Sequence, residues 1–540
     1  MNKKIVIRLF ILMLVLLFII GIEPSASAQS IQFFKQETNI SPLKSLTETE
    51  LAELDDPFFN LVLKEHPTVT NLAEIETLIQ PDESQRETFV VDEQIVDETP
   101  GQSRRAVLSF KGNNQGQSLT RNVMLSVEFN SQDFVDQQEV IEAWGWDSQR
   151  GRYNYYRLDT NQTDTLIWKF RGSSENADTL TPSQRKNTCM ACHINGAPVM
   201  KELFLPWTNW HSFSSEATYL EAGNSKSWPV AQNQRIQNGL TGAEQLEGLI
   251  LSGVRRFNSS RIDQLTPKIG ETVRVTEGKR LLKPLFETTE FNIISSRQSS
   301  RLHPFSNATL PSISPIEIPN SFFLNAELIA GGGGAGYKGL GITESRQFSQ
   351  EVKVEPAEYE QLLQEFGVQL AGQKPGDAHF AWLVPEASHV DNDWVDQLMK
   401  KDIVSPDFVA AVMAIDLETP ILSSARQRLL QFIPEQFTVE PVNTLTELTI
   451  ANLEQTNPSV HSPAGQFLER LKQGNATEDL RTKVQQYLER EKTQLENPET
   501  RFDELQRLYR IAIQHRQSIL RNQVLKTLDE TQGTLLFPVP

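Results

Sequence analysis

The chain contains only two cysteines, Cys189 and Cys192, and His193 follows them directly. A disulfide framework is therefore excluded as the element that holds the fold together, because such a framework needs several cysteines spread along the chain. The fold has to rest on apolar cores, which the 28 Phe and eight Trp residues can supply. At about 150 residues per domain, the 540 residues predict three or four folded units.

The amino terminus has the pattern of an export signal. A positive start precedes an apolar run at 9–22, and Ala26-Ser27-Ala28 then offers a small-residue cleavage site. The run is too short to span a bilayer comfortably, so we expect residues 1–28 to be removed; an uncleaved anchor is the alternative. Both interpretations place the bulk of the protein outside the cytoplasm, in the periplasm or an equivalent lumen.

Composition and motifs exclude several function classes. After the signal, no stretch reaches about 18 consecutive apolar residues, so we expect no integral membrane span. The net charge of −18 argues against nucleic acid, whose binding depends on basic side chains. The glycine-rich run Gly331–Gly339 lacks the Gly-Lys-Ser/Thr ending of a P-loop and predicts a flexible loop, so we expect no nucleotide. No hydrolase signature is present.

The two cysteines and the histidine match the C-x-x-C-H pattern of c-type haem attachment. In such a site each thiol adds to one haem vinyl group, and a separation of three residues on one helical turn places both sulfurs along the same porphyrin edge. His193 is then carried beneath the ring, where its imidazole can bind the iron. The pattern predicts one covalent haem c, anchored by Cys189 and Cys192, with His193 as the proximal ligand.

Three other interpretations of the cysteine pair compete. A redox-active dithiol has the same spacing but normally follows a strand in a βαβ unit, whereas a polar stretch at 183–186 precedes this pair. Structural zinc requires four ligands, and the chain has no second cysteine pair to supply them. A disulfide between Cys189 and Cys192 would have to close a very small ring. The haem interpretation is favoured over all three.

From Thr188 to Trp210 the sequence resembles the c-type cytochromes, specifically bacterial exported proteins that contain a cytochrome c haem-attachment segment. The resemblance implies haem binding and electron transfer. Because it covers this segment alone, it implies no fold for the whole chain.

The sequence offers three possibilities for the distal haem ligand. Small single-domain cytochromes c carry a distal methionine tens of residues after the attachment histidine, whereas Met200 follows His193 after only seven residues, which reach at most about 24 Å. His211 has ample chain to reach the other face of the haem. An open position or a remote ligand is the third possibility. The remote candidates are Met399, Met413, His303, His379 and His389.

The pattern along the chain predicts an α+β multidomain protein, in which a β-rich unit leads into a small helical, cytochrome c-like haem unit. The expected units are a mixed region at 29–103, the β-rich unit at 104–175, the haem-binding unit at 176–294, a mixed α/β second core at 320–440 and a helical region at 441–535.

Local patterns support these units. Apolar and polar residues alternate at 123–129, the period of a half-buried strand, and apolar segments at 140–146 and 153–158 flank a turn-rich spacer that predicts a hairpin. The aromatic residues here could line a ligand site, but a structural role is favoured because strands are generally rich in them; they are Trp144, Trp146, Tyr153, Tyr155 and Tyr156. Ser405-Pro406 predicts the start of a buried helix, and apolar residues at helical spacing predict two long helices within 441–535.

These observations lead to one main functional hypothesis and two alternatives. The main hypothesis is an exported monohaem protein that transfers electrons between redox partner proteins. The first alternative is a haem enzyme, for example peroxidase-like, or a gas or redox sensor with an open distal site. The second is a partner-docking module that uses the helices of 441–535 and carries the haem as a redox relay. No catalytic residue is assigned.

Overall fold

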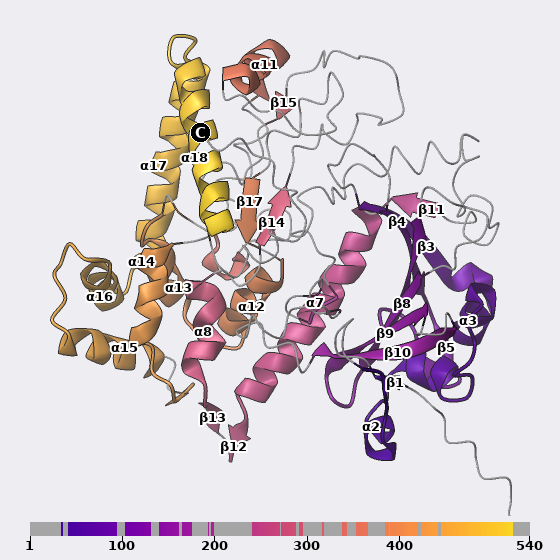
Figure 1. The fold of residues 1–540 in the computed structure, drawn as a ribbon. Helices are drawn as coiled ribbons and strands as arrows, with labels where there is room; N and C mark the ends of the chain where they lie inside the picture. The colour runs from indigo at the N-terminus through magenta and orange to yellow at the C-terminus, as the bar shows by residue number, and fades with distance from the viewer. Residues whose placement is uncertain are drawn as a thin grey trace, which may run out of the picture.

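The computed structural model combines one large β-sheet with a group of helices and several small sheets (Figure 1). It describes residues 34–35, 42–93, 103–130, 140–160, 165–174, 189, 193, 196–198, 240–242, 244–270, 272–287, 291–294, 316–317, 337–342, 353–365, 384–387, 389–417, 419, 423–440 and 444–521. The expectation of a protein that mixes α and β structure is confirmed at this level.

The large sheet has nine strands in the order β11-β3-β4-β7-β8-β9-β10-β1-β2. Its strands are β1 (Phe34–Lys35), β2 (Lys44–Ser45), β3 (Arg86–Glu93), β4 (Ser103–Phe110), β7 (Val123–Asn130), β8 (Val140–Asp147), β9 (Arg152–Thr160), β10 (Leu166–Ser173) and β11 (Leu240–Gly242). Neighbours from β3 to β10 are antiparallel, and β11 and β1 add in parallel to β3 and β10. The predicted hairpin is confirmed by the pairing of β8 with β9.

One face of the sheet packs against the segment that precedes it. This segment contains α2 (Glu48–Ala52), the π-helical turn η1 (Phe59–Leu63) and α3 (Leu72–Ile79). Their apolar side chains form one core with alternate residues of the strands, and the indole Nε1 of Trp168 donates to the carbonyl of Val69 at 2.7 Å. This core therefore contains residues of both the region 29–103 and the region 104–175, which the sequence pattern separates.

The opposite face of the sheet packs against the long helix α7 (Glu244–Leu265), which lies between the sheet and the remaining helices (Figure 1). Arg256 of α7 stacks its guanidinium over Trp146 at 4.3 Å from the ring centroid and donates to the Tyr153 hydroxyl at 2.9 Å. On its other side α7 contacts α12 (His389–Lys400), where the Asn258 amide donates to the carbonyl of Val390 at 2.9 Å. Helix α7 thus joins the sheet to the second core.

The second core is formed mainly by helices. They are α8 (Gly278–Phe286), α11 (Pro356–Glu365), α12, α13 (Pro406–Met413), α14 (Ser424–Leu429), α15 (Thr444–Gln455), α16 (Pro463–Gln473), α17 (Ala476–Glu496) and α18 (Arg501–Arg521). Residues 408–413 of α13 are all buried, and the Ser405 hydroxyl caps this helix by accepting from the Phe408 amide at 3.2 Å. The predicted cap and buried helix are confirmed.

Small sheets and short turns complete the described elements. The sheets are β5 (Asn113–Asn114) with β6 (Gln117–Ser118), β12 (Lys268–Ile269) with β13 (Thr272–Val275) and β18 (Phe437–Thr438), β14 (Phe291–Ile294) with β17 (Val384–Ala387), and β15 (Ile316–Glu317) with β16 (Lys353–Val354). The 3₁₀ turns are η2 (Glu83–Gln85), η9 (Lys338–Leu340) and η12 (Leu430–Phe432).

The two long carboxyl-terminal helices, α17 and α18, lie side by side (Figure 1). Apolar residues of both helices, among them Leu480 and Leu505, belong to the second core. Between the helices, the fully buried Glu491 carboxylate accepts from the Arg507 guanidinium at 2.6 Å. The predicted pair of long helices is confirmed, and its apolar residues pack against the rest of the chain.

Among the helices in the described part of the chain, none is both long and apolar enough to cross a bilayer. The export signal predicted at 1–28 lies outside the described residues.

The contact between η9 and α12 predicts a dependence of local stability on pH. Burial, and secondarily the nearby Asp393, raises the pKa of Asp396 to about 6, although this carboxylate accepts from the Gly339 amide at 3.4 Å. Because the folded-state pKa is raised, the stabilisation is complete below pH of about 4 and is lost as the pH rises through about 6. We expect hydrogen exchange at 338–341, corrected for its intrinsic rate, to become faster across this window.

Asp396→Asn is expected to flatten that profile, and Asp402→Asn, at an exposed position two residues beyond the same helix, serves as the control. Equal pH profiles in the wild type and Asp396→Asn would contradict the assignment.

Candidate functional site

Two backbone hydrogen bonds join His193 to described residues on either side of it. The His193 amide donates to the Cys189 carbonyl at 2.8 Å, the hydrogen bond that closes one turn of α-helix. The Gly196 amide then donates to the His193 carbonyl at 2.7 Å, and Gly196 adopts a left-handed conformation with φ of +71°. A glycine is suited to this position because side chains with a Cβ rarely adopt that conformation. The turn fixes the direction in which His193 leaves the backbone.

The orientation of the His193 ring is set by a hydrogen bond within the same segment. Its Nδ1 lies 2.8 Å from the carbonyl oxygen of Ala197. A carbonyl oxygen can only accept, so Nδ1 must carry the proton and donate. In the neutral imidazole this leaves the lone pair on Nε2, which is the arrangement found where a histidine binds a metal through Nε2. His193 is half-buried.

Tyr155 of β9 supports this turn from the sheet. Its hydroxyl donates to the carbonyl oxygens of Gly196 at 2.7 Å and Ala197 at 3.3 Å. Its ring centroid lies 4.9 Å from that of His193, with the planes inclined by 38°. Tyr155 therefore contacts both the imidazole and the carbonyl group to which the imidazole donates. The side chain itself is buried, with 2% of its surface exposed.

The described residues after His193 contact both the sheet, through Gly196 and Tyr155, and α7, through Pro198 and Gly253. Cys189 is half-buried and packs against an apolar cluster that includes Ala197. The cluster consists of Phe89, Val107, Met124, Trp146, Tyr153, Tyr155, Ala197, Leu246, Ile250, Val254, Phe257 and Val390. A Cβ on Gly253 of α7 would lie only 2.8 Å from Cγ of Pro198, so the helix approaches the segment closely. The surroundings of Cys189 are therefore mainly apolar.

The other predicted ligands are distributed as follows. Cys192 lies outside the described residues, as do Met200, His211, His303 and His379. Met399 and Met413 are buried in the second core, which is separate from the cluster around Cys189. His389 is the first residue of α12, and its neighbour Val390 belongs to the cluster around Cys189. Of the described remote candidates, only His389 thus begins an element that reaches this cluster.

Sequence analysis names Tyr155 among the aromatic residues that could line a ligand site, but it does not connect Tyr155 with His193. The aromatic residues of the hairpin were interpreted as structural, and for Tyr156 the structure agrees, because its side chain lies in the core on the opposite face of the sheet. Tyr155 is separated from Gly196 by 41 positions, and no periodic pattern connects two such positions. The sequence signal that distinguishes the two tyrosines is the alternation of strand residues between the two faces of a sheet, which places Tyr155 and Tyr156 on different sides.

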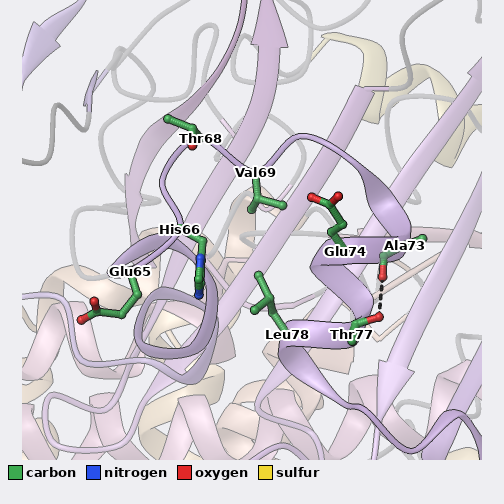
Figure 2. Close-up of a pocket in the computed structure, with 8 residues that line it drawn as sticks. All are labelled: Glu65, His66, Thr68, Val69, Ala73, Glu74, Thr77 and Leu78. Carbon is green, nitrogen blue, oxygen red and sulfur yellow. Dashed lines mark hydrogen bonds between the residues drawn. The ribbon is translucent and has the colours of Figure 1, made fainter.

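A second concave region lies on the sheet side, away from the motif. This groove of about 570 Å³ is lined by Glu65, His66, Thr68, Val69, Ala73, Glu74, Thr77 and Leu78. Figure 2 shows Glu65 and Glu74 on opposite sides of the groove, and the Thr77 hydroxyl donates to the Ala73 carbonyl at 2.7 Å. Within the part of the chain that the structure describes, no group of three or more His, Cys, Asp or Glu residues could hold a metal ion.

Comparison of the chain with family models, with curated proteins and with solved structures gives no match.

Proposed function

We propose that the protein is an exported monohaem c-type protein that transfers electrons through a covalently bound haem. Cys189 and Cys192 would form the thioether bonds, and His193 would be the axial ligand. The observation that carries the proposal is the hydrogen bond from His193 Nδ1 to the Ala197 carbonyl at 2.8 Å, because it fixes the ring in the tautomer through whose Nε2 a histidine binds iron. When bound, the haem supplies one-electron oxidation and reduction.

The residues of the chain would have distinct tasks in this function. The helical turn from Cys189 to His193 presents the first thiol and the imidazole from one short segment. The apolar cluster beside Cys189 would exclude water from one side of the cofactor, and a less polar environment is one of the means by which proteins set a haem potential. The hydrogen bond to Ala197 would make the imidazole a more basic ligand.

The apolar packing beside the motif supports electron transfer. Apolar and aromatic side chains pack against Cys189, and an apolar environment is one of the means by which proteins set a haem potential. Such a setting suits an electron-transfer protein that meets its redox partner proteins at an edge of the haem. We include in the proposal export by the signal at 1–28 to the periplasm or an equivalent lumen.

The test is expression of the full chain, with its own signal, in a bacterium that has the c-type haem maturation system. We expect the purified exported protein to have the mass of a chain beginning at Gln29 plus one haem, and its haem absorbance to survive denaturation. The bare polypeptide mass, with both thiols free, would contradict the proposal.

Carbon monoxide then separates electron transfer from the enzyme or sensor alternative. Slow or absent binding to the reduced protein indicates a strong second axial ligand and supports electron transfer. Rapid binding indicates an open distal position and favours the alternative.

A further inference from the structure

We infer that Tyr155 is a positioning residue that holds the axial imidazole of His193 in its iron-binding orientation; the inference rests on the proposed haem function. Tyr155 belongs to the sheet and not to the haem-attachment segment, so this role would make the sheet part of the redox site. Tyr155 would act by donating to the Ala197 carbonyl, the group that accepts the hydrogen bond of the His193 imidazole.

The hydroxyl of Tyr155 acts on the carbonyl group that receives the imidazole proton. Ala197 O lies 2.8 Å from His193 Nδ1 and 3.3 Å from Tyr155 Oη, and Gly196 O lies 2.7 Å from the same hydroxyl. The single O–H proton of Tyr155 is therefore shared between two consecutive carbonyl oxygens, with the shorter contact to Gly196. Fixing the peptide that carries Ala197 O fixes the direction in which Nδ1–H must point, and hence the direction of Nε2.

The phenol ring gives a second constraint on the same imidazole. The two ring centroids are 4.9 Å apart and the planes are inclined by 38°, which limits rotation of His193 about its side-chain bonds. Tyr155 is itself held in the middle of the large sheet, where β9 pairs with β8 on one side and with β10 on the other. A buried side chain on a central strand is a rigid support, as the orientation of a metal ligand requires.

Tyr155→Phe tests the hydroxyl while the ring stays in place. Removing the direct hydrogen-bond partner of a metal ligand weakens metal binding by about 10- to 100-fold. Tyr155 acts one step further away, through the Ala197 carbonyl, so we expect the lower end of that range, with His193 binding the ferric iron roughly tenfold more weakly. A proton from solution would compete with iron for His193, because both bind the same lone pair of Nε2. A tenfold weaker bond raises the midpoint of this acid transition by about one pH unit, since one proton is involved.

Tyr156→Phe is the matched control because it removes the neighbouring hydroxyl on the same strand. Tyr156 is fully buried and donates to Asp56 in the core on the other face of the sheet, so its loss loosens β9 without touching the turn of His193. Tyr153→Phe is a second control, because Tyr153 lies in the same cluster as Tyr155 while its hydroxyl accepts from Arg256. We expect the acid midpoint of both controls to stay within about 0.3 pH unit of the wild type.

The measurement is the visible spectrum of the purified ferric holoprotein, titrated with acid and repeated for each variant. A raised midpoint in Tyr155→Phe alone supports the inference. Equal midpoints in the wild type and Tyr155→Phe, or equal shifts in Tyr155→Phe and Tyr156→Phe, would overturn it, because the hydroxyl would then have no specific effect on His193. A wild-type protein that carries no covalent haem would instead refute the proposed function, and mass analysis before the titration separates the two failures.

Discussion

The double substitution Cys189→Ser and Cys192→Ser is expected to abolish the covalent attachment of haem, from one haem per chain to none. A hydroxyl is far less nucleophilic than a thiol and cannot form the thioether bonds, and the chain has no other cysteine to replace those lost. The measurement is haem absorbance that remains with the polypeptide after denaturation, together with the intact mass of the exported protein.

Three further variants make this expectation specific. Either single cysteine substitution should keep one thioether bond, so the haem stays attached with a shifted spectrum. His193→Ala should keep both thioether bonds but lose the axial ligand, which changes the spin state of the iron instead of its attachment. Met190→Ala changes one of the two residues between the cysteines, which the attachment chemistry does not use, and serves as the control. Haem that remains covalently bound in the double variant would refute the assignment of the two cysteines.

Elements that depend on local patterns could be predicted from the sequence. The hairpin of β8 and β9 follows from alternation on either side of a turn, and the start of α13 follows from Ser405 and Pro406. Each signal lies within a few residues of the structure that it specifies. The two long helices α17 and α18 were predicted for the same reason, because their apolar residues recur with the helical period.

Contacts between distant segments could not be predicted in this way. The region 29–103 gave no functional signal, yet Phe58, Leu61 and other residues of it form a core with the central strands of the sheet. The parallel pairing of β11 with β3, which brings the chain back to the sheet after the motif, has no local signature either. The hydrogen bonds of Tyr155 to the turn after His193 belong to the same class. Tertiary packing decides all three, and a single sequence records it only indirectly.

The buried carboxylate of Asp56 joins the amino-terminal segment to the strand that carries Tyr155. It is fully buried and accepts from the Phe59 amide at 3.0 Å, from the Asn154 side-chain amide at 2.9 Å and from the Tyr156 hydroxyl. Asn154 and Tyr156 are the two neighbours of Tyr155 on β9. Burial raises the pKa of Asp56, and the three hydrogen bonds counteract that effect. A Cβ on Gly145 would lie 1.9 Å from the carboxylate, so the adjacent strand β8 leaves room for it only through a glycine.

Asp56→Ala is therefore expected to destabilise the sheet by about 3 kcal/mol or more, because it leaves up to three buried donors without an acceptor at about 1–3 kcal/mol for each unsatisfied group. The measurement is hydrogen exchange of the β8 and β9 peptides in the full-length protein, where the loss of protection reports the change in the free energy of opening. Glu53→Ala is the matched control, since Glu53 is exposed and lies three residues earlier. Protection in Asp56→Ala within about 0.5 kcal/mol of that control would show that the carboxylate does not hold the sheet and the preceding segment together.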